Sequence, residues 1–403
     1  MRKLEVWYNG WGQHYLLGTL ADDGTNLLFE YSPTALGRGL ELSPLHLRLR
    51  PEAYGDFPTF FHRLPGLVAD SLPDGWGLLL MDRVFRRHGI DHPTPLDRLA
   101  FIGDRAMGAL SFVPSGAFTP EDPDWTLARL ARESERALDG DAPDVLAALV
   151  ALGGSPQGAR PKAVVQYDST TGNVSTRGDG PGEPWLVKFP AKGEHAEVCA
   201  IESLYADLAR ACGINMPTTR LFELPDGLAA FGTARFDRER GERVPIHSLS
   251  GLLHADFRAP GSVDYETFLR ATRAMTHDER EVEAAFARCA FNVVFHNHDD
   301  HARNFAYRLG SDERWRLAPA YDLTFSQGPG GEHSLDVAGK GRGITRSDLM
   351  QLATKTGVGK ASAILTLDQI STVAGSLRER GSAFPIRPDT LGKITAAVDR
   401  GRV

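Results

Sequence analysis

The chain has 403 residues, of which 42% are hydrophobic and 24% are charged, proportions typical of a soluble globular protein with room for two or three domains or a bilobal enzyme. Its formal net charge of −7 argues against nucleic acid as a main partner, because binding to a phosphate backbone requires a basic face. The cysteines Cys199, Cys212 and Cys289 are too widely spaced for a disulfide framework or a zinc knuckle, and we expect them to be buried.

No apolar segment approaches the length of a membrane span, and the first residues, Met-Arg-Lys-Leu-Glu-Val-Trp, lack the apolar core of a signal peptide. The chain also contains no internal repeat and no low-complexity tract. These features predict a cytoplasmic protein.

The first third of the chain is expected to be rich in sheet. Three apolar runs separated by Asn-Gly and Asp-Gly turns predict a meander with strands at residues 4–8, 14–20 and 27–31. A glycine-containing turn then leads to an expected helix at 78–88, and a tight loop followed by a strand is expected over 102–112. Turns alone are a sufficient explanation of the glycines in both segments.

Residues 120–144 are rich in charge, proline and alanine, and mark the expected junction between the first part of the chain and the rest. Helices are predicted at 125–138 and 142–152, the second of them ended by Gly153-Gly154. A loop of small residues, Gly153-Gly-Ser-Pro-Gln-Gly-Ala-Arg-Pro-Lys162, follows and runs into a strand predicted at 163–167.

This small-residue loop could place backbone N–H groups against phosphate, with Ser155 adding a hydroxyl and Lys162 a positive charge. Its sequence is neither a Walker A motif nor the G-x-G-x-x-G of ordinary kinases. A plain connector is therefore the alternative interpretation.

The next apolar strand carries a single lysine, in Trp185-Leu-Val-Lys188-Phe-Pro. In a kinase N-lobe, the lysine of V-A-I-K occupies such a position and pairs with the ATP phosphates and with a helix glutamate. Lys188 would be costly to bury without a partner. An edge-strand lysine that points into solvent is the alternative.

An amphipathic helix is predicted from about residue 195 to 212, ended by Gly213. Glu202 lies beside its apolar stripe and could form an ion pair with Lys188, with Glu194 and Glu197 as competitors. A hairpin over 221–237 follows. Its second strand would end at a hinge, where an adenine ring could bond backbone atoms of the neighbouring residues Ala234, Arg235 and Phe236.

The segment with the most chemical information is Asn297-His-Asp-Asp-His-Ala-Arg-Asn304, followed by Tyr321-Asp322. Asp299 and Asn304 have the spacing of the kinase catalytic loop H-R-D-x-x-x-x-N, and Asp322 stands where the metal-binding Asp of D-F-G follows a short hairpin. Asp299 would accept the proton of the attacking hydroxyl. Asn304 and Asp322 would hold Mg²⁺ beside the ATP phosphates.

These features follow one another in kinase order: small-residue loop, strand lysine, helix glutamate, hinge, helical region, catalytic loop and metal-binding Asp. They predict an ATP-dependent phosphotransferase with an α+β, bilobal, protein-kinase-like fold. The expected parts are an N-terminal β-rich subdomain at 1–115, a kinase N-lobe at 116–245 and a mainly helical C-lobe at 246–403.

Five segments form a distinctive set: Ser155-Pro-Gln-Gly-Ala-Arg-Pro-Lys162, Leu186-Val-Lys188-Phe-Pro, Ala234-Arg-Phe-Asp-Arg, Asp299-Asp-His-Ala-Arg-Asn304-Phe and Tyr321-Asp322-Leu-Thr-Phe-Ser. They closely resemble the motifs of HipA-family toxins, which are serine/threonine kinases of type II toxin–antitoxin modules. The first part of the chain also resembles that family's N-subdomain, through Leu72-Pro-Asp-Gly-Trp-Gly and Ile102-Gly-Asp-Arg-Ala-Met-Gly-Ala-Leu. The resemblance spans nearly the whole chain.

The resemblance implies a role for each matched residue. Asp299 would be the catalytic base, and Asn304 and Asp322 would bind Mg²⁺. The residues implied to bind ATP are Gln157, Gly158, Ala159, Arg160, Pro161, Lys162, Lys188, Ala234, Arg235, Phe236, His301, Arg303, Asn304, Tyr321 and Asp322. The sequence departs from the family pattern at three positions. Arg303 replaces a lysine and Ala234 a glutamate, and neither change is expected to abolish activity; the third departure is Pro156, which follows Ser155.

Ser155 matches a serine that family members autophosphorylate in trans, which shuts off ATP binding. A phosphoserine carries nearly two negative charges and would repel ATP from a tight loop, although Pro156 could slow the ejection of that loop. Family members phosphorylate aminoacyl-tRNA synthetases, which blocks translation and growth, and are held inactive by a helix-turn-helix antitoxin. The resemblance implies the same partners here, with DNA contacted only through the antitoxin.

A metal-dependent hydrolase is one alternative, because potential ligands cluster at His296, His298, Asp299, Asp300 and His301, and a further His-Asp pair occurs at 277–278. Such an enzyme would bind a transition metal without nucleotide, whereas a kinase would bind Mg²⁺ only with ATP.

A DNA-binding regulator is the other alternative, because residues 345–362 resemble a helix-turn-helix in pattern. The expected recognition helix carries little beyond Lys360 for base or phosphate contacts. A helical pair of the C-lobe is the simpler interpretation.

Overall fold

The computed structural model describes residues 1–115, 125–139, 158, 160–177 and 180–401. The chain divides into two units: the first comprises Met1–Ala196 and Arg220–His247, and the second comprises Glu197–Thr219 and Ser248–Val403. The predicted boundaries of three parts near residues 115 and 245 stay a prediction. Within the described ranges, no helix combines the length and the apolar character needed to cross a bilayer.

The first sheet of unit 1 has four antiparallel strands in the order β3-β2-β1-β4. They are β1 (Lys3–Tyr8), β2 (Tyr15–Asp22), β3 (Leu27–Tyr31) and β4 (Leu110–Val113). Leu4, Val6 and Tyr8 are buried, whereas the residues between them are partly exposed, which is the period-two pattern of a half-covered strand. The predicted meander is confirmed, and the strand predicted within 102–112 is β4, which pairs with β1.

Four helices belong to the same part of unit 1: α1 (Pro33–Arg38), α2 (Gly66–Ala69), α3 (Gly75–Arg87) and α4 (Pro95–Ile102). The helix predicted at 78–88 is confirmed as α3, which buries Trp76, Leu80 and Val84 on one face. A capping box in which Thr94 and Asp97 bond each other's backbone N–H starts α4.

A buried polar network in unit 1 contains a serine, a histidine and an aspartate. The Nδ1 of His247 lies 2.7 Å from Asp70 Oδ2, and its Nε2 lies 3.0 Å from Ser43 Oγ. These residue types also form hydrolase triads, but Ser43 and His247 are both 0% exposed, so no substrate can reach the hydroxyl. The network satisfies buried polar groups and ties three distant segments of unit 1 together.

The second sheet of unit 1 has five strands in the order β6-β5-β7-β9-β8. They are β5 (Lys162–Tyr167), β6 (Val174–Ser175), β7 (Glu183–Lys188), β8 (Thr219–Glu223) and β9 (Ala229–Ala234). Aromatic edges pack on this sheet, with ring centroids 4.9 Å apart for Tyr167 and Trp185 and 5.3 Å apart for Tyr167 and Phe222. The predicted strands at 163–167 and around Lys188 and the 221–237 hairpin are confirmed.

The described part of unit 1 also contains α5 (Leu127–Asp139) and the short strands β10 (Arg238–Glu239) and β11 (Glu242–Arg243). The helix predicted at 125–138 is confirmed as α5. The helix predicted at 142–152 and the glycines after it lie outside the described residues.

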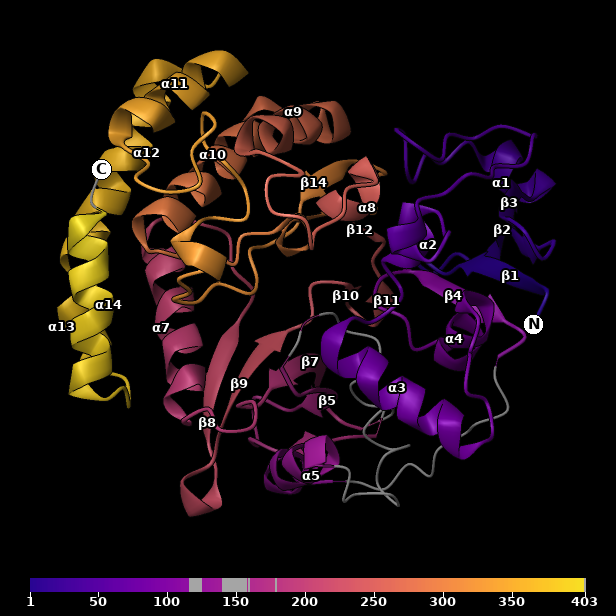
Figure 1. Ribbon diagram of the computed structural model, residues 1–403, viewed down its shortest axis with the longest axis horizontal. Coiled ribbons are helices and arrows are strands. Elements are labelled where there is room, and N and C mark those ends of the chain that lie inside the picture. The colour runs from indigo at the N-terminus through magenta and orange to yellow at the C-terminus, as the bar shows by residue number, and fades with distance from the viewer. Residues whose placement is uncertain (116–124, 140–157, 159, 178–179, 402–403) are drawn as a thin grey trace. The chain divides into compact units, whose positions relative to one another are not determined.

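Unit 2 is mainly helical. Its helices are α7 (Glu197–Ala211), α8 (Leu249–Leu253), α9 (Tyr265–Thr276), α10 (Glu279–Val294), α11 (Arg346–Thr356), α12 (Lys360–Gly375), α13 (Leu377–Gly381) and α14 (Pro388–Arg400). Strand β12 (Ile246–Ser248) lies at the boundary of the units, and β13 (Ala306–Leu309) pairs antiparallel with β14 (Trp315–Leu317). The buried helix α10 packs against α9 and α12 (Figure 1). Cys199, Cys212 and Cys289 are all buried, as predicted.

Glu197 joins the first turn of α7 to the start of α14. Its carboxylate accepts hydrogen bonds from Arg387 N at 2.9 Å, Arg387 Nε at 3.0 Å and Thr390 Oγ1 at 2.9 Å. Burial alone would raise the pKa of Glu197, but the bonds from Arg387 and Thr390 outweigh it and lower this pKa to about 2. The ionised form is therefore the form that stabilises the fold.

We expect the stabilisation from Glu197 to be present above its ordinary pKa of 4.5 and to be lost as the pH falls toward 2. The Glu197→Gln variant should unfold at lower urea than the wild type at pH 7, and the difference should shrink between about pH 4.5 and pH 2. Urea titrations at several pH values measure this difference. The control is Glu283→Gln, an exposed position on α10; a difference for Glu197→Gln that does not change with pH would contradict the expectation.

Candidate active site

Two lysines face each other across neighbouring strands of the second sheet in unit 1. Lys162 on β5 is the antiparallel register partner of Lys188 on β7, and the two residues are only 3% and 7% exposed. Since β7 lies between β5 and β9, the edge-strand alternative for Lys188 is wrong. Directly opposed side chains share a face, and like charges in such positions repel. The two basic side chains therefore share one face of the sheet, a suitable arrangement for binding a ligand with several negative charges.

The rest of the predicted phosphate loop is described only in part. Gly158 has a φ of 108°, which favours glycine, and its N–H donates to the carboxylate of Asp74. Arg160 forms an ion pair with Glu194 at 3.1 Å, and the carbonyl of Pro161 accepts from Phe189 N. Ser155, Gln157 and Ala159 lie outside the described residues, so their predicted roles stay predictions.

Two of the three candidate glutamates for the Lys188 ion pair have other partners. Glu194 binds Arg160, and Glu197 binds Arg387. Glu202 is 3% exposed in the middle of α7. The assignment of Glu202 as the partner of Lys188 stays a prediction. The alternative assignments to Glu194 and Glu197 are less favoured, because both residues bind arginines.

The predicted hinge lies where β9 ends at Ala234. The N–H of Arg235 continues the sheet by donating to the Pro184 carbonyl at 2.9 Å, and its guanidinium donates to both carboxylate oxygens of Asp237. The side chain of Arg235 is thus part of the protein framework. The backbone of Ala234 and of Phe236 remains the predicted contact for adenine.

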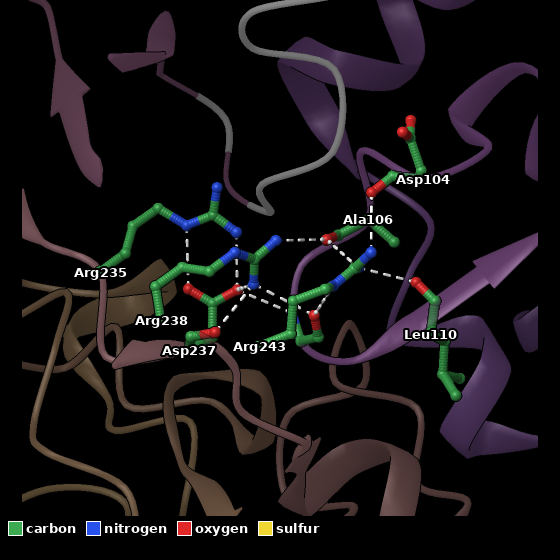
Figure 2. A network of polar contacts seen from close by, with 8 residues as sticks. Asp104, Ala106, Leu110, Arg235, Asp237, Arg238 and Arg243 are labelled. Atoms are coloured by element: carbon green, nitrogen blue, oxygen red, sulfur yellow. Dashed lines mark hydrogen bonds and ion pairs between the residues drawn. The ribbon is translucent and has the colours of Figure 1, made fainter. Parts of the chain in front are cut away.

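Asp237 is the centre of a polar network beside this hinge (Figure 2). Its carboxylate, 1% exposed, accepts from Arg235, from Arg238 at 2.9 Å and from Gly108 N at 2.7 Å. Burial would raise the pKa of Asp237, but the two arginines hold it well below its ordinary value. The network attaches the chain after the hinge to the loop that precedes β4.

Arg243 extends the same network by donating to four backbone carbonyls, those of Asp104 at 2.9 Å, Ala106 at 3.0 Å, Gly108 at 2.9 Å and Leu110 at 2.8 Å (Figure 2). The glycine-containing segment around residues 102–112 is therefore a turn, as its plain interpretation predicted. Its carbonyls are also the acceptors that position the arginines next to the hinge.

In unit 2, the predicted catalytic loop follows α10 and ends in a short 3₁₀ turn, Ala302–Asn304. The amide Nδ2 of Asn304 donates to the backbone carbonyl of Asp299 and closes the loop. The side chain of Asp299 is 56% exposed, with His301 Nε2 3.8 Å from its Oδ1. The loop thus presents a carboxylate that a substrate hydroxyl can approach, next to the amide predicted to bind the metal.

Tyr321 and Asp322 are connected to this loop. The hydroxyl of Tyr321 donates to the backbone carbonyl of Arg303 at 2.6 Å, and the β13–β14 hairpin lies between the two segments in the chain. Arg303 is buried, and its guanidinium lies 4.3 Å from the ring centroid of Phe257, a contact that no sequence motif indicates. Unit 2 therefore brings Asp299, Asn304 and the Tyr321-Asp322 segment together.

Asp322 has a φ of 57°, in the left-handed region. Asp and Asn tolerate this conformation better than other residues with a Cβ, and backbone strain of this kind is concentrated at functional sites. The strained backbone at Asp322 supports the prediction that its carboxylate is a functional group, which the sequence assigns to Mg²⁺ binding.

We expect the variants Asp322→Asn and Asp322→Ala to separate the metal-binding role of the carboxylate from the tolerance of residue 322 for a positive φ. Both variants should lose Mg²⁺-dependent binding of ATP, because both lack the carboxylate. Only Asp322→Ala should also be less stable, by about 1 kcal/mol, because alanine tolerates a positive φ poorly. Isothermal calorimetry and urea unfolding measure the two effects. Equal stabilities would contradict the strain argument, and Mg²⁺-dependent ATP binding by Asp322→Asn would contradict the metal role.

Comparisons with known proteins agree on one family. Residues 154–377 match the HipA-like C-terminal domain, and residues 4–113 match the HipA N-terminal domain. The chain belongs to the HipA family. A comparison with curated proteins gave no match.

A solved HipA from Shewanella oneidensis MR-1, in a toxin–antitoxin complex with HipB and its operator DNA, is 17% identical and covers 98% of this chain and 97% of its own, with a TM-score of 0.72. The proinflammatory kinase CtkA of Helicobacter pylori matches with 12% identity over 60% of this chain and 89% of its own, at a TM-score of 0.39, too low to carry an argument. The predicted α+β kinase-like fold, with its β-rich N-terminal part, is confirmed as the HipA fold.

The structure gives the hydrolase alternative no support in this HipA-family chain. Among the described residues, no group of three or more His, Cys, Asp or Glu could hold a metal ion. His277 ends α9 in the left-handed conformation, and Asp278 caps α10 through Arg280 N. Burial, and next the neighbouring His333, lowers the pKa of His298 to about 4, so its neutral ring is a structural group at physiological pH.

The DNA-binding alternative is also explained by packing. The residues 345–362 form α11 and the start of α12, which pack on each other, and these helices contact α9 and α10 within unit 2. The simpler interpretation as a helical pair is confirmed. Phe257 was missed as a part of the site, because no motif indicates its contact with Arg303. Asp300 was named only as a potential metal ligand of the hydrolase alternative, because nothing in the sequence distinguishes a buried aspartate from its exposed neighbour.

Proposed function

We propose that this chain is an ATP- and Mg²⁺-dependent serine/threonine protein kinase that acts as the toxin of a type II toxin–antitoxin module. The observation that supports this most is the geometry of the catalytic loop, which Asn304 closes and which presents an exposed Asp299 carboxylate. The hydrogen bond from Tyr321 to the Arg303 carbonyl joins the Tyr321-Asp322 segment to the same loop. These are the parts of a kinase catalytic half-site. The HipA family and the kinase-like fold agree with it.

The residues present fit ATP and Mg²⁺. Carboxylate and amide oxygens are the ligands that Mg²⁺ prefers, and Asp322 and Asn304 supply one of each. Since Asn304 Nδ2 donates to the Asp299 carbonyl, its Oδ1 is the atom that would face a cation. When bound, Mg²⁺ would neutralise charge on the phosphates.

Each residue then has a defined task in phosphoryl transfer. Lys188 and Lys162 would bind ATP phosphates, because the register of β5 and β7 places these two basic side chains opposite each other on one face of the sheet. Asp299 would accept the proton of the serine or threonine hydroxyl as the oxygen attacks the γ-phosphate. His301, beside Asp299, and Arg303, fixed on Phe257, would border the nucleotide.

The proposed substrate is an aminoacyl-tRNA synthetase, whose phosphorylation would block translation and growth. The proposed partner that holds the kinase inactive is a helix-turn-helix antitoxin, supported by the similarity to a HipA solved with HipB and operator DNA. The net charge of −7 favours contact with DNA only through that antitoxin. Autophosphorylation of Ser155 is the proposed off-switch, because phosphate there would repel ATP.

The test is to incubate the purified full-length protein with labelled ATP and Mg²⁺, alone, with cell extract and with a panel of synthetases, beside the Asp299→Gln variant. We expect label on Ser155 and on an extract protein, and none with the variant. Equal labelling by both proteins would reject the role of Asp299. A wild type that labels nothing in any mixture would reject the kinase function, and growth arrest that Asp322→Ala relieves would support toxicity.

A further inference from the structure

Two adjacent aspartates of the catalytic loop have opposite environments. Asp299 is 56% exposed at the side chain, whereas Asp300 is 0% exposed. A carboxylate in the protein interior is costly unless its oxygens are hydrogen-bonded. The partners of Asp300 therefore indicate why a buried charge lies next to the proposed base.

Three donors from two distant segments bond to Asp300. Its Oδ2 accepts from Tyr265 Oη at 2.6 Å and from His333 Nδ1 at 2.8 Å, and its Oδ1 accepts from Ser334 N at 2.7 Å. Tyr265 belongs to α9 and in turn accepts from Asn292 of α10 at 3.0 Å. Both oxygens of Asp300 are thus used: Oδ2 anchors the loop to α9 and to His333, and Oδ1 anchors it to Ser334.

The segment at 326–334, which follows Asp322 in the chain, is bonded to the residues just before Asp299. His298 donates through its N–H to the Ser326 carbonyl at 3.1 Å, and its Nδ1 lies 2.9 Å from the Gln327 carbonyl. The Ser334 hydroxyl donates to the His298 carbonyl at 3.1 Å. The rings of His298 and His333 have centroids 4.0 Å apart.

The close approach of these two segments also explains why residue 328 is a glycine. Gly328 has a φ of 63°, and a Cβ there would lie 2.9 Å from the Cβ of His298 and would also meet the Glu332 carbonyl. Any other residue at 328 would force the segments apart. The catalytic loop and the 326–334 segment are therefore one hydrogen-bonded assembly with Asp300 at its centre.

We propose that Asp300 is a positioning residue for phosphoryl transfer, which with His333 fixes the catalytic loop against the 326–334 segment so that Asp299 is held in its reactive place. The proposal rests on the proposed kinase function. Because Asp300 is fully buried and its oxygens bond protein groups, its loss should change kcat rather than the affinity for ATP. A displacement of about 1 Å at a reacting group can cost roughly a hundredfold in rate.

The test compares Asp300→Asn with Thr272→Val in the full-length protein, well below the melting temperature of each. Thr272 is also fully buried in α9 and bonds Phe268 O and Tyr307 Oη, so its loss removes buried hydrogen bonds away from the Asp300 network. We expect Asp300→Asn to lower kcat by about 10- to 100-fold with KM for ATP changed less than about threefold, and Thr272→Val to keep kcat. Equal losses of kcat, or an unchanged kcat in Asp300→Asn, would overturn the proposal.

A second pair of variants tests the same contact from its other side. His333→Ala should reproduce the loss of kcat, and His333→Asn should restore part of it, since the Asn amide can donate where Nδ1 did. Hydrogen exchange of Asp300→Asn should be faster in residues 297–304 and 326–334 together. Faster exchange in only one of these segments, or no rescue by His333→Asn, would overturn the coupling.

If the proposed kinase function itself were wrong, the experiments would give a different set of results. In that case the wild type would transfer no phosphate and would not differ from Asp299→Asn. The exchange experiment does not require activity, so it would still decide whether Asp300 holds the two segments together.

Discussion

Replacing Asp299 with asparagine should lower kcat for phosphoryl transfer by about 10²- to 10⁴-fold, the range that removal of a general base produces. Asparagine keeps the shape of the side chain and cannot accept the proton of the attacking hydroxyl. The Asn304 bond should survive, because its acceptor is the backbone carbonyl of residue 299. We therefore expect the loop to keep its structure in this variant, although the group that accepts the proton is lost.

The same substitution should leave the free energy of unfolding within about 0.5 kcal/mol of the wild type, because the side chain is 56% exposed. Steady-state phosphorylation and urea unfolding measure the two quantities. The matched control is Asp389→Asn, an exposed carboxylate in the first turn of α14, which should change neither. Full activity in Asp299→Asn would show that another group accepts the proton.

Replacing Asp237 with alanine should destabilise unit 1 by about 3–5 kcal/mol, because it leaves buried guanidinium groups without their carboxylate. The side chains of Arg235 and Arg238 are 7% and 17% exposed. Burial lowers the pKa of Arg238 to about 9 even with Asp237 beside it, which shows how strongly this site disfavours an unpaired positive charge. The Gly108 N–H would lose its acceptor as well.

Tryptophan fluorescence during urea unfolding measures this effect, since five of the six tryptophans, all except Trp315, belong to unit 1. The control is Arg132→Ala, which removes a surface ion pair between Arg132 and Asp226 with side chains 51% and 73% exposed. Such a pair should contribute less than about 1 kcal/mol. A cost for Asp237→Ala as small as that of the control would mean that water replaces the carboxylate in the network.

Local sequence patterns were sufficient to predict most of the helices and strands. The alternation of Leu4, Val6 and Tyr8 predicted a half-buried strand, and the apolar run around Lys188 predicted a strand, although only the structure excludes an edge position for it. The spacing of Asp299 and Asn304 predicted a loop that the structure closes through the bond between them. Each of these features depends on neighbours within a few residues.

Contacts between distant residues could not be predicted in this way. The register that places Lys162 opposite Lys188 depends on how two strands align, and the Gly108–Asp237 bond joins residues 129 positions apart. Asp300 is indistinguishable from Asp299 in the sequence until His333, Ser334 and Tyr265 surround it. The roles of Ser155 and Gln157 stay predictions, since both lie outside the described residues.

The bond between Glu197 and Arg387 has a consequence for the order in which the protein is made. The two residues are 190 positions apart, so on the ribosome α7 emerges long before the side chain that anchors its first turn. The helices α12 and α13, which pack against α7, also belong to this late part of the chain, so α7 cannot make these contacts until they have been synthesised. A nascent chain therefore cannot complete unit 2 until residue 387 has been synthesised, and we expect the proposed kinase activity to appear only after that point.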